Sequence, residues 1–276
     1  MKLGIIGQGF VGNAVYQKFK NYYKVLTYDI QAMLCNATME EVCQCDHIFI
    51  CLPTPMDKDG KCHIDIVEEA LAFVDKHSKA KTAIIKSTVV PGTTNNWNDK
   101  FNIDVVFNPE FLTEANAVSD YENQTRIILG GPRKATTKLK PIFAKVFPKA
   151  SIIKTDSTYA EMVKYVTNAF LATKVSFANE MYRICDKLGI DYDKVVEYST
   201  YDERLGKSHW AVPGPDGHYG FGGSCFPKDI NALIKVAEKM DVPPNILSAA
   251  WDTNTLVRPE KDWEELKGRA VVEEKA

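Results

Sequence analysis

The stretch GIIGQGFVG, residues 4–12, places three glycines in the order Gly-x-Gly-x-x-Gly. A short apolar run, KLGII at residues 2–6, leads into this stretch and is typical of a buried strand. Residues 10–19 follow with apolar side chains at helical spacing. The chain therefore opens with a strand, a glycine-rich turn and a helix, as a Rossmann-type fold does.

Each glycine of this turn has its own role in holding a dinucleotide. Gly7 permits the tight turn, Gly9 lets a pyrophosphate approach the backbone, and Gly12 lets the helix pack closely on the strand. Phe10 and Val11 stand at the helix N-terminus, where free N–H groups and the positive dipole end attract the anion. The turn therefore predicts a dinucleotide site.

An acidic residue at the end of the second predicted strand, residues 24–29, indicates which dinucleotide is bound. Asp29 comes 17 residues after Gly12, and a carboxylate there accepts hydrogen bonds from both ribose hydroxyls of NAD. The same carboxylate repels the 2′-phosphate of NADP. The alternative is a glycine turn in an unrelated α/β fold, with Asp29 as a solvated strand end. The strand, the glycines, the helix and the acidic residue occur in the order of an NAD site, which favours NAD binding over the alternative.

Strand and helix patterns alternate through the rest of the N-terminal half, with a clear helical pattern at residues 64–78. This alternation predicts a parallel sheet covered by helices on both faces. The further predicted strands are residues 47–52, 82–88, 103–108, 125–131 and 150–155.

The strand patterns stop at about residue 157, and helical periodicity takes over. One long helix is predicted over residues 157–189, with Thr158 and Glu161 as a capping box and Gly189 at its C-terminal end. Further helices are predicted at residues 191–201, 227–240 and 243–257. The fold class is therefore α/β, with a Rossmann-type sheet domain, a long connecting helix and a second all-α domain. The expected division is residues 1–156, residues 157–268 and a tail at residues 269–276.

Composition and charge exclude several classes of protein. The net charge of −2 provides no basic field for nucleic acid, and no apolar run reaches the ~20 residues of a membrane span. The seven cysteines are odd in number and have no zinc-binding spacing, so we expect neither a metal site nor a disulfide framework. The N-terminus lacks the pattern of a signal peptide, and we expect a cytoplasmic protein.

Polar residues follow several predicted strands, at the edge where an open α/β sheet binds its ligands. Thr54 and Pro55 follow the third strand and could wall the nicotinamide ribose. Thr88 follows the fourth strand and could hold a water or a cofactor hydroxyl. Glu110 and Glu114 follow the fifth, and a helical turn starting at Pro109 would place both carboxylates on one face. Taken singly, each of these residues is an ordinary polar loop residue. Together, on adjacent strand ends, they are typical of a ligand-binding crevice.

The stretch GFGGSCFPKD, residues 220–229, predicts a reactive thiol. Pro227 is suited to the first position of the helix 227–240, which places Cys225 just before the helix N-terminus. The helix dipole and Lys228 both favour the thiolate, the nucleophilic form of cysteine. The alternative is a small apolar residue in a structural loop.

A nucleophilic cysteine beside NAD can capture an aldehyde as a thiohemiacetal, which gives a hydride to NAD and becomes a thioester. Water then releases an acid, so prior oxidation of an alcohol would consume two NAD in all. Lys164 and Asn168 lie four residues apart on the long helix and could stabilise the oxyanions. Alone, they would be interpreted as part of a solvated helix face.

The chain resembles the UDP-glucose dehydrogenase family of nucleotide-sugar dehydrogenases, which also includes GDP-mannose dehydrogenases. Six stretches carry the resemblance, in the family's order, from residue 1 to about residue 257, and the wording GFGGSCF is most similar to the UDP-glucose members. They are GIIGQGFVG, PTP, KSTVVPGTT, NPEFLTEANAV, AEMVKYVTNAFLATKVSFANE and GFGGSCFPKDINAL.

The resemblance implies oxidation of UDP-glucose to UDP-glucuronate by a homodimer that pairs through its helical domain. Cys225 would be the nucleophile, Lys164 and Asn168 would hold the oxyanion, and Asp229 would position water. Glu114, aided by Thr88, would be the general base for thioester hydrolysis. The implied NAD-binding residues are Gly7, Gly9, Phe10, Val11, Gly12, Asp29, Thr54, Pro55, Ser87, Thr88, Glu114 and Lys228. The implied substrate-binding residues are Glu110, Phe111, Leu112, Glu114, Lys164, Asn168, Arg204, Phe221, Gly222 and Gly223.

The sequence departs from the family pattern in three places. No basic residue follows Asp29 closely, and the approach to Cys225 after Arg204 is longer than usual. Relatives also continue into a second Rossmann-like domain that completes the nucleotide pocket, and the chain ends where this domain is expected to begin. We therefore expect a weakly active chain unless another polypeptide completes the site.

Other activities remain open from the sequence. The substrate could be GDP-mannose or another nucleotide sugar, or the chain could be a catalytically idle NAD-binding dimerisation module. A β-hydroxyacid dehydrogenase shares the two-domain plan and the Lys-x-x-x-Asn helix. That class needs no cysteine nucleophile, and the GGSCFPKD stretch argues against it.

Overall fold

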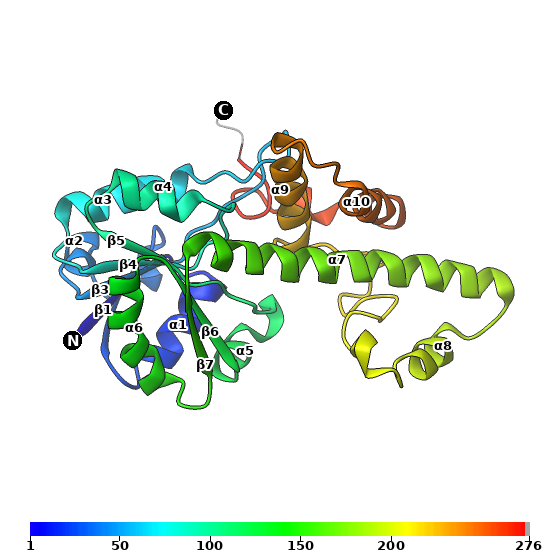
Figure 1. Cartoon of the computed structure of the whole chain (residues 1–276), viewed down its shortest axis with the longest axis horizontal. Helices are drawn as coiled ribbons and strands as arrows, with labels where there is room; N and C mark the ends of the chain where they lie inside the picture. The colour runs from blue at the N-terminus through cyan, green and yellow to red at the C-terminus, as the bar shows by residue number, and fades with distance from the viewer. Residues whose placement is uncertain (274–276) are drawn as a thin grey trace. The chain divides into compact units, whose positions relative to one another are not determined.

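The computed structural model describes residues 1–273, which form two compact units (Figure 1). Unit 1 contains Met1–Thr54 and Ile64–Lys164, and unit 2 contains Pro55–His63 and the chain from Tyr165 onward. The expected tail at 269–276 extends beyond the described residues from position 274. Within the described range, no helix has both the length and the apolar character needed to cross a bilayer.

Unit 1 is built on a seven-stranded sheet in the order β2-β1-β3-β4-β5-β6-β7. Each predicted strand is present, with ends that differ from the prediction by at most three residues. The strands are β1 (Lys2–Ile6), β2 (Lys24–Tyr28), β3 (His47–Ile50), β4 (Thr82–Ile85), β5 (Asp104–Phe107), β6 (Arg126–Gly130) and β7 (Ser151–Thr155).

The sheet is parallel, as predicted, except at one pair of strands. Strands β5 and β6 pair antiparallel through Phe107 and Gly130, whereas the other neighbouring strands pair in parallel. A parallel crossover needs a connection long enough to return along the sheet, usually a helix. Between β5 and β6 the described chain has only a 3-10 turn (Glu114–Asn116) and the six-residue helix α5 (Ala117–Glu122). Strands β6 and β7 therefore run in the direction opposite to β1–β5, and Gly130 at the end of β6 pairs with Phe107 at the end of β5.

Helices cover both faces of the sheet, as the sequence predicts. One hydrophobic cluster joins Phe19 and Phe143 to Phe49 of β3, and the other joins Leu71 and Trp97 to Ile48 of the same strand. Successive residues of β3 thus enter opposite cores, because side chains alternate along a strand. The helices of the first face are α1 (Phe10–Phe19), α5 and α6 (Arg133–Val146); those of the second are α2 (Met39–Cys43), α3 (Asp65–His77) and α4 (Thr93–Lys100).

The long helix α7 (Ser157–Leu188) is continuous, and its two ends form differently from one another. At the start, Asp156 accepts a hydrogen bond from the backbone N–H of Thr158, at 2.9 Å. At the end, Gly189 has a φ of +66° and Ile190 N–H donates to the carbonyl of Cys185, as in a Schellman motif. The predicted stop at Gly189 is confirmed.

The predicted capping box at the start of α7 is wrong, because Glu161 caps another helix. Its carboxylate accepts the backbone N–H groups of Gly92 and Thr94 at the start of α4, at 2.6 and 2.8 Å. Those amides have no partner inside α4, so the carboxylate satisfies them and complements the helix dipole. Glu161 is fully buried, and this burial raises its pKa despite the hydrogen bonds.

Unit 2 is helical, as predicted. One of its cores gathers Ala172, Phe221, Ile230 and Ala250, and another forms around Ala178 and Cys185. The backbone of Met56 pairs with Ala270 and Val272, so residues 55–63 lie against the end of the described chain. Besides the second part of α7, its helices are α8 (Tyr192–Ser199), α9 (Phe226–Lys239) and α10 (Asn245–Val257), with 3-10 turns at Glu203–Leu205 and Asp262–Glu265.

Candidate functional site

The glycine turn between β1 and α1 is shaped to receive a pyrophosphate. Gly7 has a φ of +91°, and a Cβ atom on Gly12 would lie 1.9 Å from the carbonyl oxygen of Gly7. A Cβ atom on Gly9 would meet no atom within 4 Å, so the backbone is open there. Gly9 is also the N-cap of α1, and no side chain caps that helix. The uncapped N–H groups and the open backbone fit the anion of a dinucleotide.

Asp29 follows β2 directly and is held at the carboxyl edge of the sheet. Its Oδ2 atom accepts the N–H of Gln8 at 2.6 Å, and its Oδ1 atom accepts the N–H of Gln31 at 2.9 Å. Each carboxylate oxygen keeps a lone pair for a ribose hydroxyl. Ile30 and Met33, 92% and 87% exposed, follow this acid in the sequence. These positions fit the adenosine half of NAD, with apolar rather than cationic contacts.

Replacing Asp29 with Ala is expected to narrow the preference for NAD over NADP. A hydrogen bond to a charged group contributes about 1.5–3 kcal/mol, so we expect about tenfold weaker NAD binding or more. NADP should lose less, because the repulsion of its 2′-phosphate disappears with the carboxylate. Calorimetric titration of both cofactors measures the preference, and Asp29→Asn separates charge from hydrogen bonding. Wild-type protein that binds NADP as tightly as NAD would contradict the prediction.

The ends of β3 and β4 bring three predicted residues together in unit 1. Thr54, Ser87 and Thr88 are all buried, and the Thr54 hydroxyl donates to the carbonyl of Thr88 at 2.7 Å. The Ser87 hydroxyl accepts the N–H of Leu52 at 3.0 Å. Pro55, expected beside Thr54, begins the segment that belongs to unit 2. The three hydroxyl residues therefore form a fixed polar edge next to the glycine turn.

A buried ion pair stands at the end of β5. Lys164 and Glu110 are 3% and 6% exposed, and the Lys164 ammonium donates to both the Oε1 atom and the carbonyl of Glu110, each at 2.7 Å. Leu112 N–H donates to the Oε2 atom at 2.8 Å. Burial would raise the pKa of Glu110, but Lys164 and these hydrogen bonds hold it below the usual value. Glu110 is therefore an ionised carboxylate clamped to an ammonium.

The expectation that Glu110 and Glu114 share one helical face is wrong. Residues 109–113 are not helical, and Glu114 is the first residue of the 3-10 turn. The carbonyl groups of Pro109 and Glu110 accept hydrogen bonds from the side chains of Lys86 and Lys164, which hold this segment outside a helix. Glu110 is consequently buried and Glu114 exposed.

Cys225 is the N-cap residue of α9, as the sequence predicts. It is partly exposed, and its carbonyl accepts the N–H of Asp229 at 3.0 Å. Pro227 is the second residue of the helix rather than the first, because α9 begins at Phe226. A thiol in this position faces the positive end of a 14-residue helix.

Three predicted residues of unit 2 form a chain of hydrogen bonds near Cys225. Asp229 is 1% exposed, and its two oxygens accept Asn168 Nδ2 at 2.6 Å and Lys228 Nζ at 2.5 Å. Burial alone would lower the pKa of Lys228, but the charges of Asp229 and Cys225 raise it above the usual value. Lys228 is thus a persistent cation in the first turn of α9, and Asp229 orients the Asn168 amide.

The glycine loop before Cys225 is held by residues that sequence reasoning missed. Phe221 is 4% exposed, and its N–H donates to Asn254 at 2.7 Å. Gly223 N–H donates to Asp262 at 3.0 Å, and a Cβ atom on Gly222 would lie 2.3 Å from Arg258. The buried Asn254 and Arg258 break the apolar pattern of the α10 region, which is the one sequence signal that could have found them.

Arg204, Phe111 and Leu112 occupy less enclosed positions. The Arg204 side chain is 88% exposed and pairs with Asp202, to which it donates at 2.5 Å. Phe111 lies under two cations, with Arg126 4.4 Å and Lys164 5.5 Å from its ring centre. Leu112 is partly buried against the core that includes Phe19. Their part in substrate binding stays a prediction.

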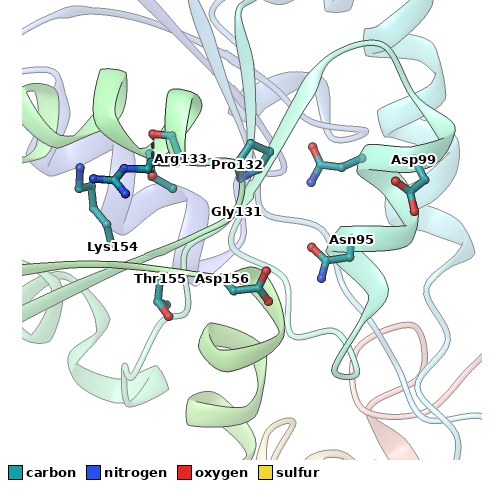
Figure 2. Close-up of a pocket in the computed structure, with 10 residues that line it drawn as sticks. Asn95, Asp99, Gly131, Pro132, Arg133, Lys154, Thr155 and Asp156 are labelled. Carbon is teal, nitrogen blue, oxygen red and sulfur yellow. Dashed lines mark hydrogen bonds between the residues drawn. The ribbon is translucent and has the colours of Figure 1, made fainter.

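A pocket of about 840 Å³ opens in unit 1 where β6 and β7 end (Figure 2). Arg133 and Lys154 stand together on one side of it, and Asn95 and Asp99 of α4 stand on the other (Figure 2). None of the site residues predicted from the sequence lines this pocket. Strands β6 and β7 run opposite to β1, so the chain that follows them leads away from the glycine turn.

Comparison with protein families matches both halves of the chain. The NAD binding domain of the UDP-glucose/GDP-mannose dehydrogenase family matches residues 23–147, and the central domain of this family matches residues 158–256. UDP-glucose 6-dehydrogenase AglM of Haloferax volcanii is 31% identical, over 92% of this chain and 69% of the relative. The chain belongs to the UDP-glucose/GDP-mannose dehydrogenase family, and it contains the NAD-binding domain of that family.

Two further comparisons set the extent of this similarity. UDP-glucose 6-dehydrogenase TuaD of Bacillus subtilis is 34% identical over 76% of this chain, which spans 46% of the relative, about half its length. The solved structure of a UDP-glucose dehydrogenase from Pyrobaculum islandicum superposes with a TM-score of 0.83 at 27% identity. The superposition covers 96% of this chain and 70% of that structure, so the shared fold includes both units.

Proposed function

We propose that the protein oxidises a nucleotide sugar at C6, converting UDP-glucose to UDP-glucuronate in two hydride transfers. The observation that carries this proposal is Cys225 at the N-terminus of α9, beside the hydrogen-bonded series of Lys228, Asp229 and Asn168. A dehydrogenase that stops at the carbonyl product has no need of a nucleophile in this environment. The names of the relatives, which are UDP-glucose 6-dehydrogenases, support the same substrate class.

NAD supplies the hydride acceptor, and the glycine turn and Asp29 would hold its pyrophosphate and ribose. Thr54, Pro55, Ser87 and Thr88 would line the nicotinamide end, where the buried hydroxyls exclude bulk water. Phe10, Val11, Glu114 and Lys228 complete the proposed cofactor contacts.

Cys225 acts in the second oxidation. Its thiolate adds to the carbonyl carbon of the aldehyde, and the carbonyl oxygen becomes the oxyanion of a thiohemiacetal. Departure of the hydride converts this adduct to a thioester, and water then attacks the thioester carbon. The carbon–sulfur bond breaks, which releases the carboxylate and returns the thiolate.

The charged groups stabilise these steps. Lys164 and Asn168 would hold the oxyanion, and Asp229 would fix the amide of Asn168 and position the water. Glu114, with Thr88, would take a proton from that water. Arg204, Glu110 and the backbone of Phe221, Gly222 and Gly223 would bind the sugar nucleotide, together with Phe111 and Leu112.

We extend the proposal to a cytoplasmic homodimer that pairs through unit 2. Phe170, Phe177, Ile184 and Leu188 of α7 repeat at helical spacing and are 46–67% exposed, and Ile246 of α10 is 73% exposed. An exposed apolar stripe of this length is typical of a subunit interface. We expect light scattering to give twice the chain mass, and Phe170→Glu with Phe177→Glu to give the monomer mass. A wild-type monomer at every concentration would contradict the dimer.

Release of NADH tests the function directly. The protein is mixed with NAD and either UDP-glucose or GDP-mannose, and absorbance at the NADH band is followed while the sugar products are identified. Two NADH for each UDP-glucuronate would support the proposal. Activity with GDP-mannose alone would change the substrate. Tight NAD binding with no oxidation of either sugar would favour an idle NAD-binding module.

The division into residues 1–156, 157–268 and 269–276 remains part of the proposal.

A further inference from the structure

A second buried lysine stands beside the Glu110–Lys164 pair, and the proposed mechanism does not use it. Lys86 follows β4 and is 2% exposed. Its ammonium donates to Asn108 Oδ1 at 3.0 Å and to the carbonyl of Pro109 at 3.2 Å. The Asn108 amide donates in turn to the carbonyl of Ile128 at 2.8 Å, which ties the arrangement to β6. Lys86 therefore holds the chain immediately before Glu110.

The groups that face Lys86 form a small buried charge cluster. Glu110 and Lys164 are its charged neighbours, and Cys51 and the ring of Tyr121, 5.4 Å away, complete the surroundings. The Cys51 thiol stays neutral, because burial raises its pKa to about 12. Burial lowers the pKa of Lys86 to about 8; the charge of Lys164 adds to this effect, whereas the charge of Glu110 opposes it. At neutral pH the cluster thus contains two ammonium groups and one carboxylate.

The second cation matters because Lys164 has two partners in the proposed mechanism, the Glu110 carboxylate and the oxyanion of the substrate. In the ground state Lys164 clamps Glu110, yet the proposed reaction needs the same ammonium at the oxyanion of the substrate. A buried carboxylate that loses the cation paired with it is strongly destabilised. Lys86 donates to the carbonyl of Pro109, the residue before Glu110, and its charge lowers the pKa of Glu110 together with that of Lys164.

We propose that Lys86 is a positioning residue, which keeps Glu110 ionised and in place while Lys164 engages the reacting oxygen. The proposal rests on the proposed function for its catalytic part. Its structural part, that Lys86 maintains the ionised state and the backbone position of Glu110, is independent of turnover.

Three variants separate charge, hydrogen bonding and packing. Lys86→Gln keeps donors for Asn108 and Pro109 but removes the charge, and Lys86→Arg keeps the charge. Tyr121→Phe is the matched control, because it alters the same surroundings by removing a hydroxyl that has no hydrogen-bond partner among the described residues. Circular dichroism and NAD affinity establish that each variant is folded.

Steady-state kinetics, the pH dependence of kcat and an NMR titration decide the proposal. With UDP-glucose and NAD, Lys86→Gln should lower kcat about tenfold or more, with a smaller change in KM, since the loss lies in the transition state. Wild-type kcat should decline above about pH 8 as Lys86 loses its proton, and Lys86→Arg should recover the rate and lack this decline. Carbon-13 NMR of the Glu110 carboxyl should show a higher pKa in Lys86→Gln than in the wild type, Lys86→Arg or Tyr121→Phe.

The NMR titration distinguishes failure of the inference from failure of the proposed function. If the wild type oxidises no nucleotide sugar, the function fails, and the Glu110 titration still decides the role of Lys86. An unchanged Glu110 titration in folded Lys86→Gln would overturn the inference. So would a folded Lys86→Arg in which Glu110 titrates as it does in Lys86→Gln, because a cation at this position would then have no effect.

Discussion

Replacing Cys225 with Ser is expected to stop formation of the uronic acid while leaving NAD binding unchanged. The serine hydroxyl is not ionised at neutral pH, so it is a far weaker nucleophile than the thiolate at the N-terminus of α9. Loss of a catalytic nucleophile lowers turnover by orders of magnitude, and we expect a fall of at least about a thousandfold. Gly7, Gly9 and Asp29 lie in unit 1 and are untouched, so the affinity for NAD should stay within about twofold.

Product analysis and a second cysteine variant make this test specific. The rate of UDP-glucuronate formation is followed by chromatography, and NAD affinity is measured on the same sample. Cys185→Ser is the matched control, since that thiol is 5% exposed in the core of unit 2 and has only a packing role. Uronic acid formed by Cys225→Ser at the wild-type rate would show that Cys225 is not the nucleophile.

The sequence was sufficient for most of the secondary structure, because its signals are local. Short apolar runs located the seven strands, and helical periodicity located α7 to within one residue. Helix α6 was not resolved from the sequence, and it contains Pro141, a residue that normally interrupts a helical pattern. The direction of β6 was not predicted either, because no residue near β6 indicates whether this strand joins the sheet parallel or antiparallel.

The residues of the candidate site also differ in how far the sequence predicts them. Cys225, Asp29 and the glycine turn were predictable because neighbours in the sequence create their environments. The partners of Glu161 and Lys86 were not, because Glu161 is 69 residues from Gly92 and Lys86 is 22 residues from Asn108. The groups that satisfy a buried charge are often distant in the sequence. The residues around the charge therefore do not predict them.

Replacing Lys164 with Met is expected to destabilise unit 1 as well as to abolish turnover. The change leaves the Glu110 carboxylate buried without the ammonium that donates to its Oε1 atom and to the backbone carbonyl of the same residue. Breaking a buried pair from one side typically costs about 3–5 kcal/mol. We expect the free energy of unfolding at pH 7 to fall by about 3 kcal/mol, at the lower end, because Lys86 remains beside the carboxylate.

The pH dependence of this loss identifies its cause. In the wild type the pKa of Glu110 is lowered, so its contribution to stability is complete above the pKa of an unfolded glutamate, about 4.3, and disappears as pH falls through the lower folded value. In Lys164→Met burial dominates, the carboxyl protonates more readily, and the difference from the wild type should shrink as pH falls. Urea unfolding between neutral and acid pH measures this difference.

A double variant separates the unpaired charge from the loss of packing. Lys164→Met with Glu110→Gln removes both charges and keeps an acceptor for the N–H of Leu112, so it should regain most of the lost stability but none of the turnover. If the double variant were as unstable as Lys164→Met, the defect would come from the shape of the methionine rather than from an uncompensated carboxylate. If Lys164→Met were fully stable and Glu110 remained ionised, Lys86 alone would suffice to hold it.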